Sequence, residues 1–161
     1  MLAEGGLLHG VGVSVHQPIE NAALLTTFPC LVVHTIAGVA DPETYRNLAD
    51  KNLNLLILGY KDYGRGIAYH TDHNEVERKL RWVEGHVIDF SDHFRSICFD
   101  DLSVRQLGLK DKLSEEAWNL LYMGDSGEYT MYVDLVKGEF AASLVSERRT
   151  IFSNNIRSLF G

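Results

Sequence analysis

Four short apolar runs in the first hundred residues constrain the fold of this 161-residue chain most strongly. Each run is almost continuously apolar at its centre, and the runs span 11–16, 30–36, 53–58 and 96–99. Strands that are covered on both faces have this pattern, as in parallel sheets. We therefore expect four buried strands of a parallel sheet.

Helical patterns separate these runs. We expect a helix over 19–27 after Pro18, a second that begins at Asp41-Pro42, and a third over about 74–94, where Gly85 allows a break. Alternating strands and helices are typical of a parallel α/β sheet with right-handed crossovers. The chain is short for a complete eight-fold barrel, which needs about 250 residues.

The pattern changes after Asp101. The expected elements are a short helix over 102–107, a helix that starts at Ser114, a hairpin of strands 127–136 and 139–143, and a closing helix from Ser146. No flexible linker interrupts the sequence, so we expect a single domain over 1–161, with 102–161 as a C-terminal extension of 1–101.

Composition and charge argue against two classes of partner, nucleic acids and membranes. The net charge of −7 disfavours a nucleic-acid partner, and no apolar run is long enough for a membrane helix. The first residues have no basic leader followed by an apolar stretch, so we expect a cytoplasmic protein. Cys30 and Cys98 lie inside apolar runs, and we expect both to be buried free thiols.

Polar residues follow the expected strands at their carboxyl ends. They are His16-Gln17, His34-Thr35, Gly59-Tyr60-Lys61 and Asp100-Asp101. Ligands bind at this edge of parallel sheets, so we expect the four places to lie side by side. A neutral imidazole there can orient a ligand or move a proton, although a histidine that is hydrogen-bonded within the fold is the common alternative.

Two further segments have a binding and a structural interpretation. The glycine-rich loop 59–66 carries Lys61 and Arg65, which suit a carboxylate or phosphate, but it lacks the P-loop motif and also fits a surface loop. His70 and His73 have metal-ligand side chains. Since no third ligand is near in sequence, a solvated helix start is the simpler interpretation, and we expect no metal site.

The stretches 99–107 and 122–141 resemble the C-terminal part of radical S-adenosylmethionine (SAM) proteins, and 13–16 and 55–61 resemble later strands of their barrel. The most specific part is Tyr122-Met123-Gly124-Asp125-Ser126-Gly127-Glu128-Tyr129 with the hairpin that follows. The resemblance implies a partial parallel (β/α) barrel of about four βα units, followed by the hairpin and closing helix.

The resemblance also implies a SAM site. The chain departs from the family pattern in one major respect, the cysteine motif. Radical SAM proteins bind a 4Fe–4S cluster with CxxxCxxC, whereas this chain has only Cys30 and Cys98. The chain would therefore be the second half of a split or truncated barrel, inactive alone, with the cluster supplied by an N-terminal half or a partner chain. By resemblance, the methionine or ribose would face Ser14, His16, His34 and Thr35, the adenine would face Gly59 and Tyr60, and the substrate would face Lys61, Arg65 and Asp100.

Two other functions fit the same pattern. A half-barrel leaves strand edges and an apolar face uncovered, so the chain would serve as a non-catalytic module that binds a partner or a second copy of itself. The third interpretation is a non-radical enzyme, in which the strand-end His and Asp residues perform acid–base chemistry or hold a single metal.

Overall fold

The computed structural model describes residues 9–28, 30–62, 73–124, 131–143 and 146–150. Contacts between residues divide the chain into two compact units, 1–114 and 115–161, and each unit has its own sheet. The expected change of pattern lies after Asp101, whereas the boundary between the units lies after Ser114. Across the described ranges, no helix combines the length and the apolar character that a bilayer span requires.

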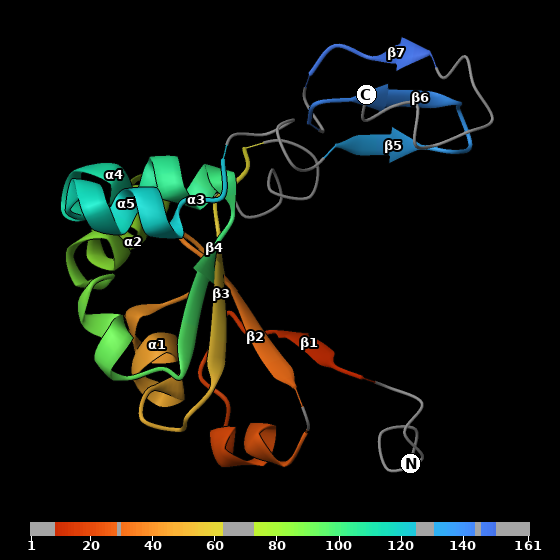
Figure 1. Ribbon diagram of the computed structural model, residues 1–161. Coiled ribbons are helices and arrows are strands. Elements are labelled where there is room, and N and C mark those ends of the chain that lie inside the picture. Colours follow the sequence, from red (N-terminus) through yellow and green to blue (C-terminus); the bar gives the residue numbers. More distant parts are fainter. Residues whose placement is uncertain (1–8, 29, 63–72, 125–130, 144–145, 151–161) are drawn as a thin grey trace. The chain divides into compact units, whose positions relative to one another are not determined.

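The first unit contains a four-stranded parallel sheet, as the apolar runs predict (Figure 1). Its strands, in spatial order, are β1 (Val11–Ser14), β2 (Leu31–Ile36), β3 (Asn54–Leu58) and β4 (Ser96–Phe99). Spatial order equals sequence order, so the chain adds each strand on the same side of the previous one. The parallel α/β class is therefore confirmed.

Helical segments connect these strands or follow the last of them. They are η1 (Ala22–Thr27), α1 (Pro42–Leu48), α2 (His73–His86), η3 (Asp89–Asp92), α3 (Asp101–Gln106) and α4 (Leu109–Lys112). The predicted helix over 19–27 is shorter and 3-10 in form, and the Thr26 and Thr27 hydroxyls donate to carbonyls three residues back. The predicted helix over 74–94 ends at His86, one residue after Gly85, and η3 follows.

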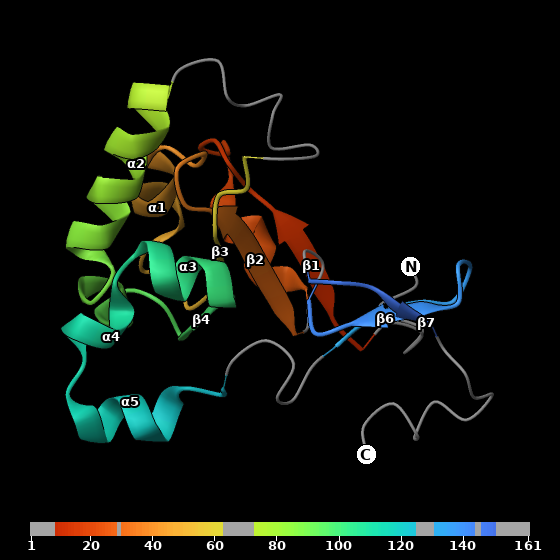
Figure 2. The same ribbon diagram turned by 90° about the horizontal axis from the view of Figure 1, so that it is seen from above.

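One face of this sheet is covered. In both views α1, α2 and α3 lie on the same side of the strands (Figures 1 and 2). Right-handed crossovers between sequential strands place α1 and α2 on one face. Val33, Leu55 and Ile57 point toward the helices and are almost completely buried. Tyr45 of α1 and Val83 of α2 contribute to this core, which fixes the helices on the sheet.

The second face is only partly covered in the described chain, which corrects the prediction of strands buried on both faces. On this open face the edge-strand side chains are exposed and the central ones are half-buried. It consists of Gly12, Ser14, Val32, His34, Ile36, Asn54, Leu56, Leu58, Ser96 and Cys98. The prediction of buried thiols is also wrong, because Cys30 and Cys98 are both exposed.

The second unit contains α5 (Glu115–Leu121) and an antiparallel sheet of β5 (Tyr132–Asp134), β6 (Glu139–Ala141) and β7 (Arg149–Thr150). The predicted hairpin is confirmed by the pairing of β5 with β6, and Gly138 supplies the positive φ of +66° near its turn. No helix begins at Ser146, because Arg149 and Thr150 pair with β6 as a strand. The remainder of that predicted helix, 151–161, lies outside the described residues.

Candidate functional site

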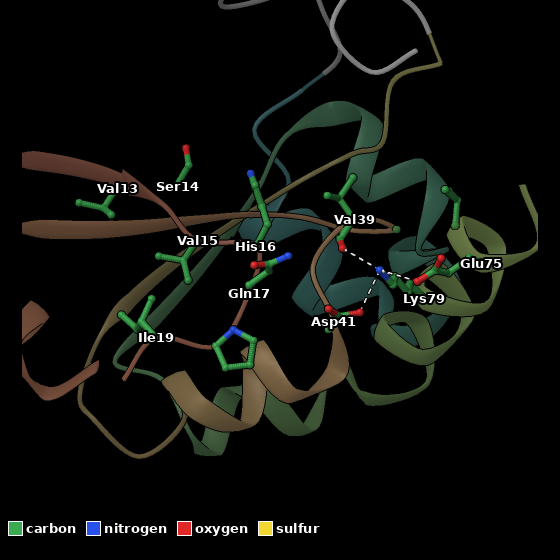
Figure 3. A pocket seen from close by; sticks show the side chains of 13 residues that line it. Val13, Ser14, Val15, His16, Gln17, Ile19, Val39, Asp41, Glu75 and Lys79 are labelled. Carbon is green, nitrogen blue, oxygen red and sulfur yellow. Dashed lines mark hydrogen bonds and ion pairs between the residues drawn. The ribbon is translucent and has the colours of Figure 1, made fainter. Parts of the chain in front are cut away.

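A cavity of about 660 Å³ lies at the carboxyl end of β1 (Figure 3). Its walls come from residues 13–19, the loop that follows β2, and the first half of α2. Ligand cavities in proteins have volumes of about 300–1,000 Å³, and parallel sheets bind ligands beyond the carboxyl ends of their strands. This cavity is therefore the candidate site, and it lies at the carboxyl end of a strand, where the sequence predicts ligand-binding residues.

Lys79 of α2 closes one wall of the cavity. Its Nζ lies 2.9 Å from Asp41 Oδ1 and 3.0 Å from Glu75 Oε1, and it donates to the Val39 carbonyl at 3.1 Å. Burial lowers the pKa of Lys79, but the hydrogen bonds with the two carboxylates outweigh this effect and raise it overall. Lys79 is therefore a charged group that is only 12% exposed.

The loop between β2 and α1 places the partners of Lys79. Gly38 has a φ of +87°, and a Cβ there would lie 3.0 Å from Val76 Cγ1, so only glycine lets this loop lie so close to α2. Asp41 is the N-cap residue of α1, yet its side chain makes no capping hydrogen bond. Its carboxylate pairs with Lys79 instead, which joins α1 to α2 beside the cavity.

His16 lies on the opposite wall, where it points to the same side as Ser14 (Figure 3). Its carbonyl accepts from the Thr44 hydroxyl at 3.2 Å, which holds the backbone against α1. Its Nδ1 is buried and has no hydrogen-bond partner among the described residues. Burial lowers the pKa of His16, so the neutral imidazole predominates near pH 7 and presents one donor and one acceptor.

His34 and Thr35 do not share a wall, because successive strand residues face opposite sides. His34 lies on the open face beside Ser14, its register partner, and two residues before β2 ends. A Cβ on Gly12 would lie 2.9 Å from His34 Cε1, so the ring packs closely over that glycine. Thr35 is completely buried on the helix side of the sheet, near Tyr45. Burial raises the pKa of Tyr45 to about 12.

Gly59, Tyr60 and Asp100 come together in a network that joins β3 to α3. Asp100 Oδ1 accepts from the backbone N–H groups of Gly59 and Ser103, both at 2.8 Å. Gln106 forms a reciprocal pair with Tyr60: its Oε1 accepts from Tyr60 N at 2.8 Å and its Nε2 donates to Tyr60 O at 2.9 Å. We call these five residues the β3–α3 clasp.

The β3–α3 clasp changes the interpretation of three predicted ligand contacts. The Gly59 and Tyr60 N–H groups, which the resemblance assigns to adenine, already donate to Asp100 and Gln106. Asp100, which the resemblance assigns to the substrate region, is the N-cap of α3. In this structure the backbone atoms at the end of β3 therefore stabilise the fold.

Lys61 lines a second cavity of about 510 Å³, together with Tyr60 and residues of α2 and α3. Arg65 and His70 lie outside the described residues, and His73 is the exposed first residue of α2. Across the described ranges, no group of three or more His, Cys, Asp or Glu side chains could hold a metal ion. Cys30 directly precedes β2 and Cys98 lies in β4, and these two thiols do not fit a 4Fe–4S cluster by themselves.

Sequence reasoning found part of this site. It placed Ser14 and His16 at the carboxyl end of β1, and both line the cavity. It missed Lys79 and Glu75, because a Glu and a Lys four residues apart usually form a solvated pair on a helix. It also missed Gln106, for which the sequence offers no local signal.

Searches against protein-family models, curated proteins and solved structures find no match for this chain.

Proposed function

We propose that this chain is the second half of a radical SAM-like barrel, which contributes the SAM and substrate side of the site but not the 4Fe–4S cluster. The proposal combines the resemblance of residues 122–141 with the topology of the first unit. Since the chain alone has too few cysteines for the cluster, we expect it to be inactive alone.

The one-sided sheet is the observation that supports this proposal best. In a (β/α) barrel each strand is followed by a helix on the outside, and the inner face is covered only when the ring is complete. The first unit has sequential parallel strands, helices on one face and an open second face. A doubly wound sheet would instead have helices on both faces.

The cavity at the end of β1 supports the SAM part of the proposal. Its volume suits a nucleoside-sized molecule. Ser14, His16 and Gln17 offer a hydroxyl, a neutral imidazole and an amide, which can hydrogen-bond to ribose hydroxyls or to an amino acid group. In the complete enzyme the cluster would supply the electron for SAM cleavage, and these residues would bind and orient SAM.

We expect the purified chain to bind SAM in a calorimetric titration, and His16→Ala to weaken binding about fivefold to tenfold through the loss of a hydrogen bond. His9→Ala is the matched control, because His9 precedes the other end of β1 and does not line the cavity. The control should bind SAM as the wild type does.

Two results would contradict the proposal. One is the absence of heat and of any saturable binding with SAM at millimolar concentration. The other is a stable 4Fe–4S spectrum after anaerobic reconstitution of the isolated chain with iron and sulfide, since that would show that the chain carries the cluster itself.

A non-catalytic partner module is the second candidate, and the strand edges favour it. Among the described residues β1 pairs only with β2, and β4 pairs only with β3, so each leaves one row of backbone groups without a strand partner. Exposed parallel edges are favourable sites for pairing with another chain. Under this proposal a separate half-barrel or a second copy covers both edges and the open face.

A further inference from the structure

The outer edge of β1 permits a further inference, which goes beyond the proposed function because it does not involve SAM. We infer that two copies of this chain pair through their β1 strands, antiparallel and with a two-fold axis at Val13, so that their four-stranded sheets form one continuous sheet. The inference depends on the direction of the β1 backbone groups, on the composition of the segment around β1, and on the symmetry of the edge.

The first step is the direction of the backbone groups. Val15 N donates to the His34 carbonyl at 2.9 Å, so the backbone groups of Val15 and Val13 face β2. Those of Gly12 and Ser14 face outward, because direction alternates along a strand. In both views β1 is the outermost strand of its sheet (Figures 1 and 2), and among the described elements only β2 packs extensively against it. The outward N–H and C=O groups of Gly12 and Ser14 therefore have no partner among the described residues.

The second step is the lack of protection on this edge. Edge strands commonly carry charged side chains, prolines or bulges that prevent pairing with another chain. β1 pairs with β2 in an uninterrupted register, contains no proline, and lies in a segment, 9–19, that has no Asp, Glu, Lys or Arg. An uncharged edge suits a second copy in particular, because a charge close to the two-fold axis would meet the same charge of its mate. Two such edges can approach although each chain has a net charge of −7.

The third step is the symmetry of the outward groups. Gly12 and Ser14 lie on either side of Val13, so a two-fold axis at Val13 places Gly12 of one copy opposite Ser14 of the other. Each of these two pairs can exchange two N–H···O bonds, which gives about four bonds in all. The two Val13 residues then form a non-hydrogen-bonded pair, with Cα atoms about 4.5 Å apart. The edge is therefore complementary to itself, as a symmetric dimer requires.

This edge also has a place in the proposed barrel. In a complete barrel the strand that precedes β1 would occupy the same edge, so a second copy occupies it only while that half is absent. Pairing between copies requires no SAM, so its failure would leave the proposed SAM site unaffected. It also leaves the open face uncovered.

The expected dimer is weak because β1 has only four residues. We expect a Kd on the order of 100 µM in sedimentation equilibrium, as for interfaces below the standard size. Ser14→Pro should raise the Kd about tenfold or more, because it removes two of the bonds between copies while the bonds to β2 remain. Ser14→Ala is the matched control and should keep the wild-type Kd, since it removes only the hydroxyl. A wild-type chain that is monomeric at about 1 mM would overturn the inference.

A disulfide test determines the register and does not depend on the folding of Ser14→Pro. In a background of Cys30→Ser and Cys98→Ser, Val13→Cys places two thiols at the axis, where the distance between Cα atoms permits a disulfide. Val11→Cys is the matched control, because Val11 is half-buried on the same face of β1 but its two copies would lie about 14 Å apart. With oxidised glutathione as the oxidant, we expect Val13→Cys, but not Val11→Cys, to form a disulfide-linked dimer. Equal cross-linking of both variants, or none of either, would overturn the inference.

Discussion

Gly59→Ala should destabilise the first unit by about 3 kcal/mol in the free energy of unfolding. A Cβ at this position would lie 2.5 Å from Leu102 Cγ, 2.7 Å from Leu102 Cβ and 2.7 Å from Ser103 N. The last two atoms belong to the start of α3 and cannot rotate away. The methyl group would therefore push α3 from the end of β3 and weaken the 2.8 Å bond from Gly59 N to Asp100.

Gly85→Ala is the internal control for this experiment. Gly85 lies within α2, and a Cβ there would meet nothing within 4 Å. The change should stabilise the chain by about 0.5–1 kcal/mol, because alanine has the higher helix propensity. Urea unfolding followed by Trp82 fluorescence, in a Trp118→Phe background, reports on the first unit. Equal midpoints for Gly59→Ala and the wild type would contradict the packing described for Gly59.

Asp100→Ala should have an effect of similar size, about 2–4 kcal/mol of lost stability. The change removes the cap of α3, which contributes about 1 kcal/mol. It also leaves the buried Gly59 N–H without its acceptor, which costs about 1–3 kcal/mol. The same urea measurement tests it.

Two variants show whether this loss comes from the hydrogen bonds of Asp100. Asp100→Asn keeps one acceptor oxygen and should recover a large part of the stability. Asp111→Ala removes an exposed carboxylate of α4 that accepts no hydrogen bond from any described residue, and it should change stability by less than about 0.5 kcal/mol. If Asp100→Ala is as stable as Asp111→Ala, the β3–α3 clasp does not hold α3 in place.

The strands were predictable because apolar runs and local start signals are short-range features. Asp41-Pro42 begins α1 where the sequence places it. The open face was not predictable from the sequence, because Val32, Leu56 and Leu58 on that face are apolar like the buried residues that alternate with them. Such runs look the same whether one face or both are covered, so the number of layers cannot be read from them.

The candidate site was predictable only where it follows strand ends. His16 comes directly after β1 and lines the cavity, as expected. Lys79 is buried through contacts with Val39 and Asp41, which lie in a loop far away in sequence and approach α2 at Gly38. The sequence places Asp100 at the end of a strand, as the structure does. Its structural role depends on the hydrogen bond with Gly59 N, a tertiary contact that the local sequence does not reveal.

Thiol labelling of Cys98 tests most directly whether the parallel sheet has one open face. Cys98 lies on that face and is exposed, and Cys30→Ser makes it the sole thiol. We expect the dilute native chain to react within about tenfold of the rate of the urea-unfolded chain. Slower labelling as protein concentration rises would indicate that a second copy covers the face. Strong protection of Cys98 at the lowest concentration, in a monomer, would contradict the one-sided sheet.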